Sequence, residues 1–348
     1  AYEISTRDWS SDVCSSDLLV AGLAALGVGG LGTAGVVASG GARVVRRSAV
    51  AFGTVVSLDL VDDGRGDHEA AFAAGFATIR AIERAANLFD PTSEISRLNR
   101  EGVVERPSPD FLALVRFALG LAAASDGAFD PTIQPIWNAW SVAAEAGGRP
   151  TAAALSAAVA LVDHRALEVS DDRVAFARPG MGLTLNSLAQ GHATDRVSAV
   201  VAAQGIDRAF LVTGEFGALG RAPTGRTWRV GIAHPRRDGV EIGRVDLASR
   251  RFVATSADQP CAWTADFSEH HIVEPWSGHS PRALAEVAVV ASSGLVADGL
   301  STALMVTGPA GLDRLLALDP SAGAVMVNKA GEVRLGGSGT ADVVLVAT

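Results

Sequence analysis

The chain has 348 residues, and its 38 aspartate and glutamate residues outnumber its 29 lysine and arginine residues, giving a formal net charge of −9. This acidic balance excludes a basic nucleic-acid-binding protein. The composition, with 48% hydrophobic and 19% charged residues, also excludes a disordered chain and predicts a sizeable core. Lys329 is the only lysine, so any lysine-dependent chemistry must use it. The two cysteines, Cys14 and Cys261, match no metal-binding or redox spacing.

Two N-terminal segments do not belong to the expected fold. Residues 1–17 contain four acidic residues against Arg7 alone, whereas a signal peptide begins with basic residues. This stretch also resembles translated sequencing-adapter read-through, so we expect residues 1–17 to be non-native. Residues 18–42 form an uncharged, glycine-rich run ending in small residues suited to cleavage. We expect residues 18–45 to be an export signal or, alternatively, a membrane anchor, and the protein to be periplasmic, either free or held at the inner membrane.

The expected fold begins with a strand and a helix. From Ala51 the stretch AFGTVVSLDLV alternates and is rich in β-branched residues, which predicts a strand. Residues 68–88 carry apolar side chains at helical spacing and predict the first helix. The segment FDPTSEISRLN at 89–99 is typical of a turn, with Asp90 or Thr92 as a helix cap.

The middle of the chain is expected to be largely helical. Ser108-Pro109-Asp110 begins a helix that extends to about Ala124, with proline at the favoured first position. Pro150-Thr151 begins an alanine-rich helix that ends before His164. Short strands at 166–169 and 173–176 precede a further strand at about 183–186, which leads into a helix from about Ser187 to Gly205.

The C-terminal part is expected to be rich in strands. Strands are predicted at 209–213, 227–234, 241–247, 251–255 and 285–291, with those at 241–247 and 251–255 forming a hairpin-like pair. Helices follow at 294–307 and 310–318, and residues 324–335 predict a closing hairpin. Because helices and strands interleave without a steady βαβ rhythm, the predicted class is α+β, in one compact domain with two lobes over residues 46–348.

Two polar constellations lie on predicted helices. Asp298 and Thr302 are four residues apart, so they share one helix face and can offer a carboxylate and a hydroxyl to one hard cation. The alternative is a solvated aspartate beside a threonine bonded to its own backbone. In 184–197, free N–H groups at a helix start favour phosphate, and Asn186, Ser187, Gln190, Gly191 and Asp195 lie around that start. The alternative there is an ordinary capped helix.

Two further constellations contain aromatic and imidazole rings. Asp130-Pro131-Thr132 repeats the FDPT turn of residues 89–92, and it precedes Trp137 and Trp140. Each tryptophan is expected in the core, with a flat ring-binding wall as the alternative. His270, His271 and His279 fall within ten residues, but their spacing does not suit zinc, so one histidine is expected to act as a proton acceptor.

Taken in order, the motifs FDPTSEISRLN, GAFDPT, LNSLAQGHATD, LVTGE, VATS, HHIVEPWSGHSP and ADGLSTAL resemble the FAD:protein FMN transferases, the ApbE-type flavin transferases. The resemblance covers about residues 49–345. It implies a T-fold-related domain that binds FAD and Mg²⁺, transfers FMN to a threonine or serine hydroxyl of a target protein, and releases AMP. The implied acceptor is a membrane or periplasmic electron-transfer subunit.

The resemblance also implies roles for individual residues. Asp298, Thr302 and the carbonyl of Ser187 match the metal ligands, and His271 matches the histidine that helps to deprotonate the acceptor hydroxyl. The implied catalytic residues are therefore His271 and Asp298. The residues expected around the flavin nucleotide are Asn99, Asp130, Thr132, Gln190, Asp195, Thr213, Gly214, Glu215, Thr255 and Ser256.

Five residues depart from the common family pattern. Gln190 replaces a lysine, Asn186-Ser187 replaces Gly-Gly, Glu215 replaces a glycine, and Glu274 replaces an aspartate. This version resembles the branch associated with nitrous oxide reductase maturation. Without the lysine, Mg²⁺ must neutralise more of the pyrophosphate charge. Two alternatives keep the site: an Mg²⁺-dependent FAD pyrophosphatase that yields FMN and AMP, and a non-catalytic flavin-binding maturation or electron-transfer factor.

Overall fold

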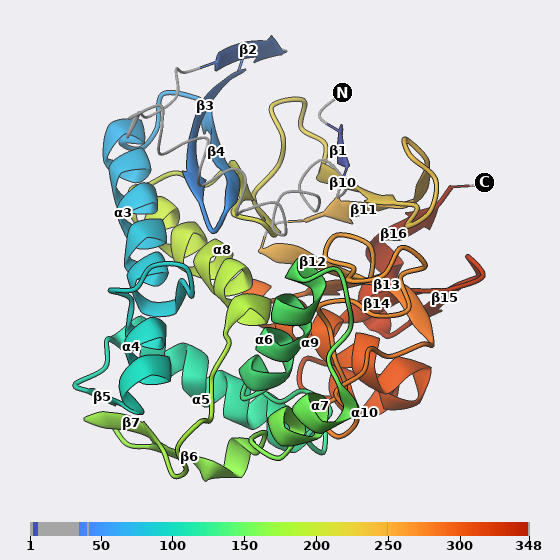
Figure 1. Ribbon diagram of the computed structural model, residues 1–348. Coiled ribbons are helices and arrows are strands. Elements are labelled where there is room, and N and C mark those ends of the chain that lie inside the picture. The colour runs from blue at the N-terminus through green and yellow to red at the C-terminus, as the bar shows by residue number, and fades with distance from the viewer. Residues whose placement is uncertain (1–2, 6–34, 40–41, 249, 347–348) are drawn as a thin grey trace.

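The computed structural model describes residues 3–5, 35–39, 42–248 and 250–346 (Figure 1). Most of the expected non-native segment, and residues 18–34 and 40–41 of the expected export segment, lie outside the described residues. Residues 35–39 and 42–51 form two strands, β2 and β3, that pair antiparallel with each other. The export and anchor hypotheses remain predictions.

A nine-stranded sheet forms the centre of the molecule, with strand order β15-β14-β13-β12-β9-β8-β4-β3-β2 and antiparallel neighbours throughout. Its strands are β2 (Gly35–Ser39), β3 (Ala42–Ala51), β4 (Thr54–Asp62), β8 (Ala209–Val212), β9 (Phe216–Leu219), β12 (Arg251–Ala257), β13 (Leu284–Ala291), β14 (Gly323–Asn328) and β15 (Val333–Gly336). Strand β13, with the sequence LAEVAVVA, is buried along its whole length because both faces of the sheet are covered.

A smaller sheet covers one face of the large one. Its order is β1-β10-β11-β16, with β1 (Glu3–Ser5), β10 (Trp228–Ala233), β11 (Glu241–Leu247) and β16 (Val343–Leu345). Trp228 and Val230 of β10 pack in one apolar cluster with Ala288 and Val290 of β13. A short 3₁₀ helix, Ser338–Asp342, precedes β16.

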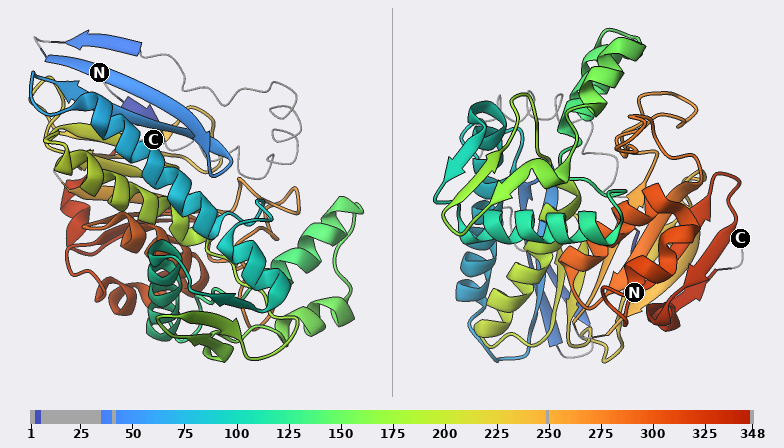
Figure 2. Two further views of the ribbon diagram at one scale, coloured as in Figure 1. Left: turned by 90° about the vertical axis from the view of Figure 1, so that its left-hand side faces the viewer. Right: turned by 90° about the horizontal axis from the view of Figure 1, so that it is seen from below.

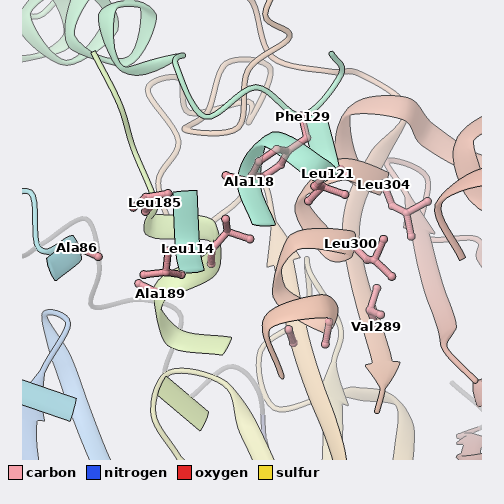
Figure 3. Packing of buried hydrophobic residues seen from close by; sticks show 14 of the residues in the cluster. Ala86, Leu114, Ala118, Leu121, Phe129, Leu185, Ala189, Val289, Leu300 and Leu304 are labelled. Carbon is pink, nitrogen blue, oxygen red and sulfur yellow. The ribbon is translucent and has the colours of Figure 1, made fainter. Parts of the chain in front are cut away.

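Helices cover the opposite face. They are α3 (His68–Ala86), α8 (Asn186–Ala203) and α9 (Gly294–Thr307), followed by a 3₁₀ turn (Gly308–Gly311) and α10 (Leu312–Leu316). Leu300 of α9 lies beside Val289 of β13 (Figure 3), and Leu304 and Leu121 belong to the same buried cluster. The stretch Gly294–Leu316 is apolar and long enough to cross a membrane, but 61% of its most apolar window is buried, as in a core helix.

A second, mainly helical lobe is inserted between β4 and β8 (Figure 2). It contains α4 (Glu94–Glu101), α5 (Pro109–Ala124), α6 (Gln134–Glu145), α7 (Ala152–Val159) and the 3₁₀ turn His164–Ala166. Its three-stranded sheet has the order β5-β7-β6, with β5 (Val103–Glu105), β6 (Leu167–Val169) and β7 (Arg173–Phe176). The predicted α+β class and the two lobes are confirmed.

Several predicted boundaries are confirmed and explained by capping. Ser108 caps α5 with Pro109 at its first turn, and Thr151 caps α7. Helix α9 spans the predicted residues, 294–307. The two FDPT turns share the same chemistry, because Asp90 and Asp130 each accept hydrogen bonds from the backbone N–H and hydroxyl of the threonine two residues on.

Four predicted elements are wrong in detail. The strand expected from Ala51 begins at Thr54, because Phe52 and Gly53, with φ of 53° and 74°, form a hairpin turn. Ser93, and not Asp90 or Thr92, caps the helix that follows the first FDPT motif. In the described residues before α8, Gly182 forms only an isolated bridge with Ile133, so no strand leads into that helix. The pair 241–247 and 251–255 is not a hairpin, because β11 and β12 belong to different sheets.

Candidate active site

A cavity of about 980 Å³ lies between the two lobes. The helical lobe contributes the turn before α4, the start of α6 and the segment 180–187, while the sheet lobe contributes β12, α9 and the segment 259–273. This volume is at the upper end of the range for small-molecule pockets, about 300–1,000 Å³. Of the residues expected in the site, those that line the cavity are Asn99, Asp130, Ser187, Gln190, Gly214, Glu215, Thr255, Ser256, His271, Asp298 and Thr302.

Three expected nucleotide-binding residues do not line the cavity. Asp195 instead accepts hydrogen bonds from the Ser293 hydroxyl and from the backbone N–H groups of Gly294 and Leu295, so it holds the start of α9. Thr213 is fully buried, and its hydroxyl contacts the Thr194 hydroxyl at 2.5 Å and the Gln190 carbonyl at 3.1 Å. Thr132 is also fully buried and bonds to Asp130. These side chains support the walls, because helix starts and turns need partners for their polar groups.

A close crossing of α8 and α9 positions Asp298. A Cβ atom on Gly191 would lie 2.2 Å from the Gly294 carbonyl oxygen, so only glycine permits this approach. The Gly191 N–H donates to Asp298 Oδ2 at 2.9 Å. Asp298 is therefore hydrogen-bonded to α8, the helix whose second residue, Ser187, is predicted to supply a carbonyl to the metal.

Two buried carboxyl groups face the cavity from this region. Burial raises the pKa of Asp298 to about 7. Burial first, and then the charge of Asp298, raise the pKa of Glu215 well above its ordinary value, although the Thr255 N–H donates to Glu215 Oε2 at 3.2 Å. Two carboxylates in one dry site repel each other, so a cation between or beside them would relieve both burial costs.

Further hydroxyl groups lie near that of Thr302, one of the predicted metal ligands. The Ser256 hydroxyl lies 3.1 Å from that of Thr302 and 2.8 Å from that of Ser301. Together with Asp298 they form a set of oxygen donors, which suits Mg²⁺. The described residues contain no group of three or more histidine, cysteine, aspartate or glutamate side chains arranged for a metal. A hard cation that keeps some of its water ligands needs no such group.

Acidic side chains outnumber basic ones in the cavity wall. Its acidic side chains are Asp130, Glu215, Glu286 and Asp298, whereas Arg100 is the only arginine or lysine among the described lining residues. A pyrophosphate would meet carboxylates on this wall without a matching number of basic side chains. The balance favours a bound divalent cation as a source of positive charge.

His271 lies on the cavity wall, and its backbone N–H donates to the Cys261 carbonyl at 2.9 Å. Burial lowers the pKa of its imidazole to about 4, so the ring is neutral at pH 7 and able to accept a proton. The neighbouring His270 is fully buried behind the wall. His279 does not line the cavity; it is half exposed and contacts buried Glu269 at 3.0 Å. Only His271 of the three is placed for chemistry in the cavity.

The opposite wall is built from turns and aromatic side chains. Asn99 donates to the Leu183 carbonyl at 2.9 Å and accepts from the Leu183 N–H at 2.7 Å, which fixes the segment that leads into α8. Trp137 lines the cavity and contacts Trp263 edge to face, with 6.4 Å between ring centroids. Trp140, only 1% exposed, stacks on Trp263 at 5.2 Å. The core expectation therefore holds for Trp140 only.

Phe89 of the first FDPT motif belongs to this wall, and His164 supports the wall through Asp130, although the sequence analysis predicts neither side chain in the site. Phe89 lines the cavity although its side chain is 56% exposed. His164 Nδ1 lies 2.9 Å from Asp130 Oδ2 and its backbone N–H donates to the same oxygen at 3.0 Å. The repetition of FDPT was a signal for Phe89, whereas no local pattern links His164 to a residue 34 positions earlier.

Gln190 stands where the family resemblance expects a lysine, and it lies against the β8–β9 turn. Gly214 in that turn has φ of 98°, and a Cβ atom there would lie 2.1 Å from the Gln190 amide carbon. The Gln190 carbonyl accepts from the hydroxyls of Thr194 and Thr213. The Gln190 side chain is therefore closely packed against the turn. It lines the cavity with a neutral amide in place of a charged lysine.

The sequence of this chain is similar to those of known proteins. A sequence model of the ApbE family matches residues 52–337. The chain is 26% identical over 275 residues to the FAD:protein FMN transferase of Vibrio cholerae serotype O1, covering 77% of this chain and 82% of that protein. It is 28% identical to the Rhodobacter capsulatus FAD:protein FMN transferase over 298 residues, 81% of this chain and 56% of that protein.

Solved structures share the fold. The apo form of Pseudomonas stutzeri flavinyl transferase ApbE is 29% identical and superposes with a TM-score of 0.75, covering 88% of this chain and 98% of that one. The ApbE protein of Thermotoga maritima is 22% identical, with a TM-score of 0.75 over 86% of this chain and 99% of that one.

Proposed function

Since this chain belongs to the ApbE family, whose sequence model covers residues 52–337, we propose that it is an FAD:protein FMN transferase. The acceptor hydroxyl oxygen forms a bond to the FMN phosphorus while the bond from that phosphorus to the AMP oxygen breaks. The hydroxyl proton passes to a base and AMP leaves. The observation that carries this proposal is one cavity lined by a neutral imidazole, His271, and by the buried carboxyl of Asp298.

Mg²⁺ fits the residues present. Asp298, Thr302 and the Ser187 carbonyl would hold it, and all three residues line the cavity. The raised pKa values of Asp298 and Glu215 and the excess of carboxylates support a cation at this wall. When bound, the ion supplies positive charge to the pyrophosphate and to the departing AMP phosphate.

His271 supplies the base. Its pKa of about 4 keeps the imidazole neutral at physiological pH, so it can accept the acceptor's proton. A serine or threonine hydroxyl suits such a base, because its proton must be removed as the bond to phosphorus forms. The aromatic and amide side chains of the other wall, including Trp137 and Asn99, bind and orient the flavin nucleotide.

The decisive experiment incubates the protein with FAD, Mg²⁺ and a flavin-accepting domain, followed by intact-mass analysis of the acceptor and measurement of AMP. A mass gain of one FMN with equimolar AMP supports transfer. AMP without a mass gain means that water is the acceptor and the protein is an FAD pyrophosphatase. Bound, intact FAD without AMP means a flavin carrier, and either of these results overturns the proposal.

The site of action is part of the same proposal. The uncharged run 18–42 supports export to the periplasm, where a membrane-bound or periplasmic electron-transfer subunit is the acceptor. Fusing residues 18–50 to a reporter enzyme active only after export tests this, and a reporter that stays inactive contradicts it.

A further inference from the structure

The only lysine of the chain takes part in a charge cluster behind the cavity. Lys329, in the turn between β14 and β15, bonds through Nζ to Asp258 Oδ2. Arg236, in the loop between β10 and β11, holds the same carboxylate with Nη1 2.7 Å from Oδ1 and Nη2 2.5 Å from Oδ2. Asp258 is fully buried, whereas the two cations are 29% and 26% exposed. None of the three lines the cavity or belongs to the proposed catalytic set.

Asp258 marks the point where the chain leaves the central sheet. It directly follows β12, and its backbone N–H donates to the Ala285 carbonyl of the neighbouring strand at 2.9 Å. The next residues, 259–261, line the cavity, and after an excursion the chain returns to the cavity at His271. The His271 N–H then bonds to the Cys261 carbonyl, which closes the segment 259–271 into a loop.

The same two cations hold the far part of this loop. The Lys329 Nζ atom donates to the Phe267 carbonyl at 3.2 Å. The Arg236 guanidinium lies over the Phe267 ring, 4.5 Å from its centroid. Phe267 has φ of 56°, an unfavourable value for a residue other than glycine, so its conformation depends on contacts of this kind. The cluster thus fastens both the base and the outer turn of the loop.

We infer that Lys329, acting with Arg236 through Asp258 and Phe267, is a positioning residue that holds the loop 259–271, and with it His271, at the cavity wall. The inference rests on the proposed function only for the role given to His271. Removing one partner from a buried, hydrogen-bonded charge cluster leaves the others poorly compensated, so the loop loosens. A displaced base costs rate more than it costs nucleotide binding.

The test compares Lys329→Met, Lys329→Arg and Arg251→Met in the full-length protein. Arg251 is the matched control, because it lies on the same strand, β12, at its opposite end and pairs with Asp342. Hydrogen–deuterium exchange should increase in residues 259–271 of Lys329→Met and not in those of Arg251→Met. For Lys329→Met, kcat of FMN transfer at saturating FAD should fall about tenfold, and the FAD Kd should change less than twofold. Lys329→Arg keeps the positive charge, so its kcat should be close to that of the wild-type protein.

Unchanged exchange in residues 259–271 of Lys329→Met overturns the inference, whatever reaction the protein catalyses. Equal loss of kcat in Arg251→Met, or a loss of kcat matched by weaker FAD binding, also overturns it. If the wild-type protein releases AMP without labelling the acceptor, the proposed function fails, and the exchange data together with AMP release still decide the role of Lys329.

Discussion

Apart from Asp130 and Arg100, the wall from the helical lobe presents mainly rings and amides to the cavity, such as Trp137, Phe89 and Asn99. The wall from the sheet lobe presents carboxylates, hydroxyls and an imidazole. The first set lies in the turn before α4, near the end of α4 and at the start of α6. The second set lies on α9, on β12 and on a loop fastened to the sheet. A wall of rings and amides can bind a large flat ligand, while the opposite wall can polarise one of its bonds.

The two walls also differ in how closely their residues are packed. The reactive wall depends on the glycine contact between α8 and α9, which allows no Cβ at Gly191 or Gly294. The binding wall tolerates partly exposed side chains such as Phe89 and Trp137. Substitutions on the two walls should therefore separate chemistry from binding, as the following four predictions state.

Asp298→Ala should have the largest effect. Loss of the carboxylate ligand removes about 3 kcal/mol of transition-state stabilisation, which lowers Mg²⁺-dependent AMP release about 100-fold or more. The fold should persist, because the lost group is a buried carboxyl with a raised pKa. Steady-state kinetics and thermal melting check this, with the exposed acid Asp313→Ala as the control. Unchanged AMP release would remove Asp298 from the metal site.

His271→Ala should slow transfer at saturating FAD by about 100-fold, the lower end of the effect of a general base. The FAD Kd should stay unchanged, because the base acts on the acceptor. At saturating Mg²⁺, protonation of the base should lower the rate of the wild-type enzyme only below about pH 4. His279→Ala, in the same motif but outside the cavity, is the control. Full activity of His271→Ala would assign the base to another residue.

Mg²⁺ affinity should depend on pH through Asp298. With a pKa of about 7, the carboxyl must lose a proton to bind the ion, so affinity should rise up to about tenfold per pH unit toward pH 7 and then level off. For the same reason the metal-free protein should lose stability as pH rises from about 4 through 7, because the folded state binds this proton more tightly than the unfolded chain does. Titration calorimetry measures the affinity, and a flat profile from pH 5.5 to 8 contradicts the assignment.

Trp137→Ala should have the smallest effect, and it should change the affinity for FAD and not the rate of transfer. Loss of one aromatic contact costs about 1 kcal/mol, which weakens FAD binding about fivefold and leaves kcat nearly unchanged. Quenching of flavin fluorescence measures the Kd, and Trp276→Ala, a 59% exposed tryptophan outside the cavity, is the control. A fall in kcat larger than the change in Kd would show that this wall also takes part in the reaction.

Much of the fold could be predicted because local signals and tertiary packing agree. Ser108-Pro109 and Ser293 cap the helices that follow them, and β13 is a continuous apolar run. The predictions were wrong where the pairing of a strand depends on partners that are distant in the sequence. Strand β11 pairs with β10 and β16, and β12 pairs with β9 and β13, although a short loop joins β11 to β12.

The candidate site divides in the same way. The sequence motifs predict His271, Asp298, Thr302 and Gln190 in the site, and the structure brings these four residues to one cavity. In the structure, Asp195, Thr213 and Thr132 do not line the cavity. They hydrogen-bond to the helix start and turns beside them, whose polar groups need partners. A motif lists polar residues without telling which of them face a ligand.

The sequence by itself determined the residue types, the helix caps, the α+β class and the family, since these depend on local chemistry and on ordered motifs. Only the tertiary structure decided that one wall is acidic and the other aromatic, that Gly191 meets Gly294, and that Lys329 holds the loop of His271. Burial and charge balance depend on which distant segments pack together, and that packing is a property of the folded chain.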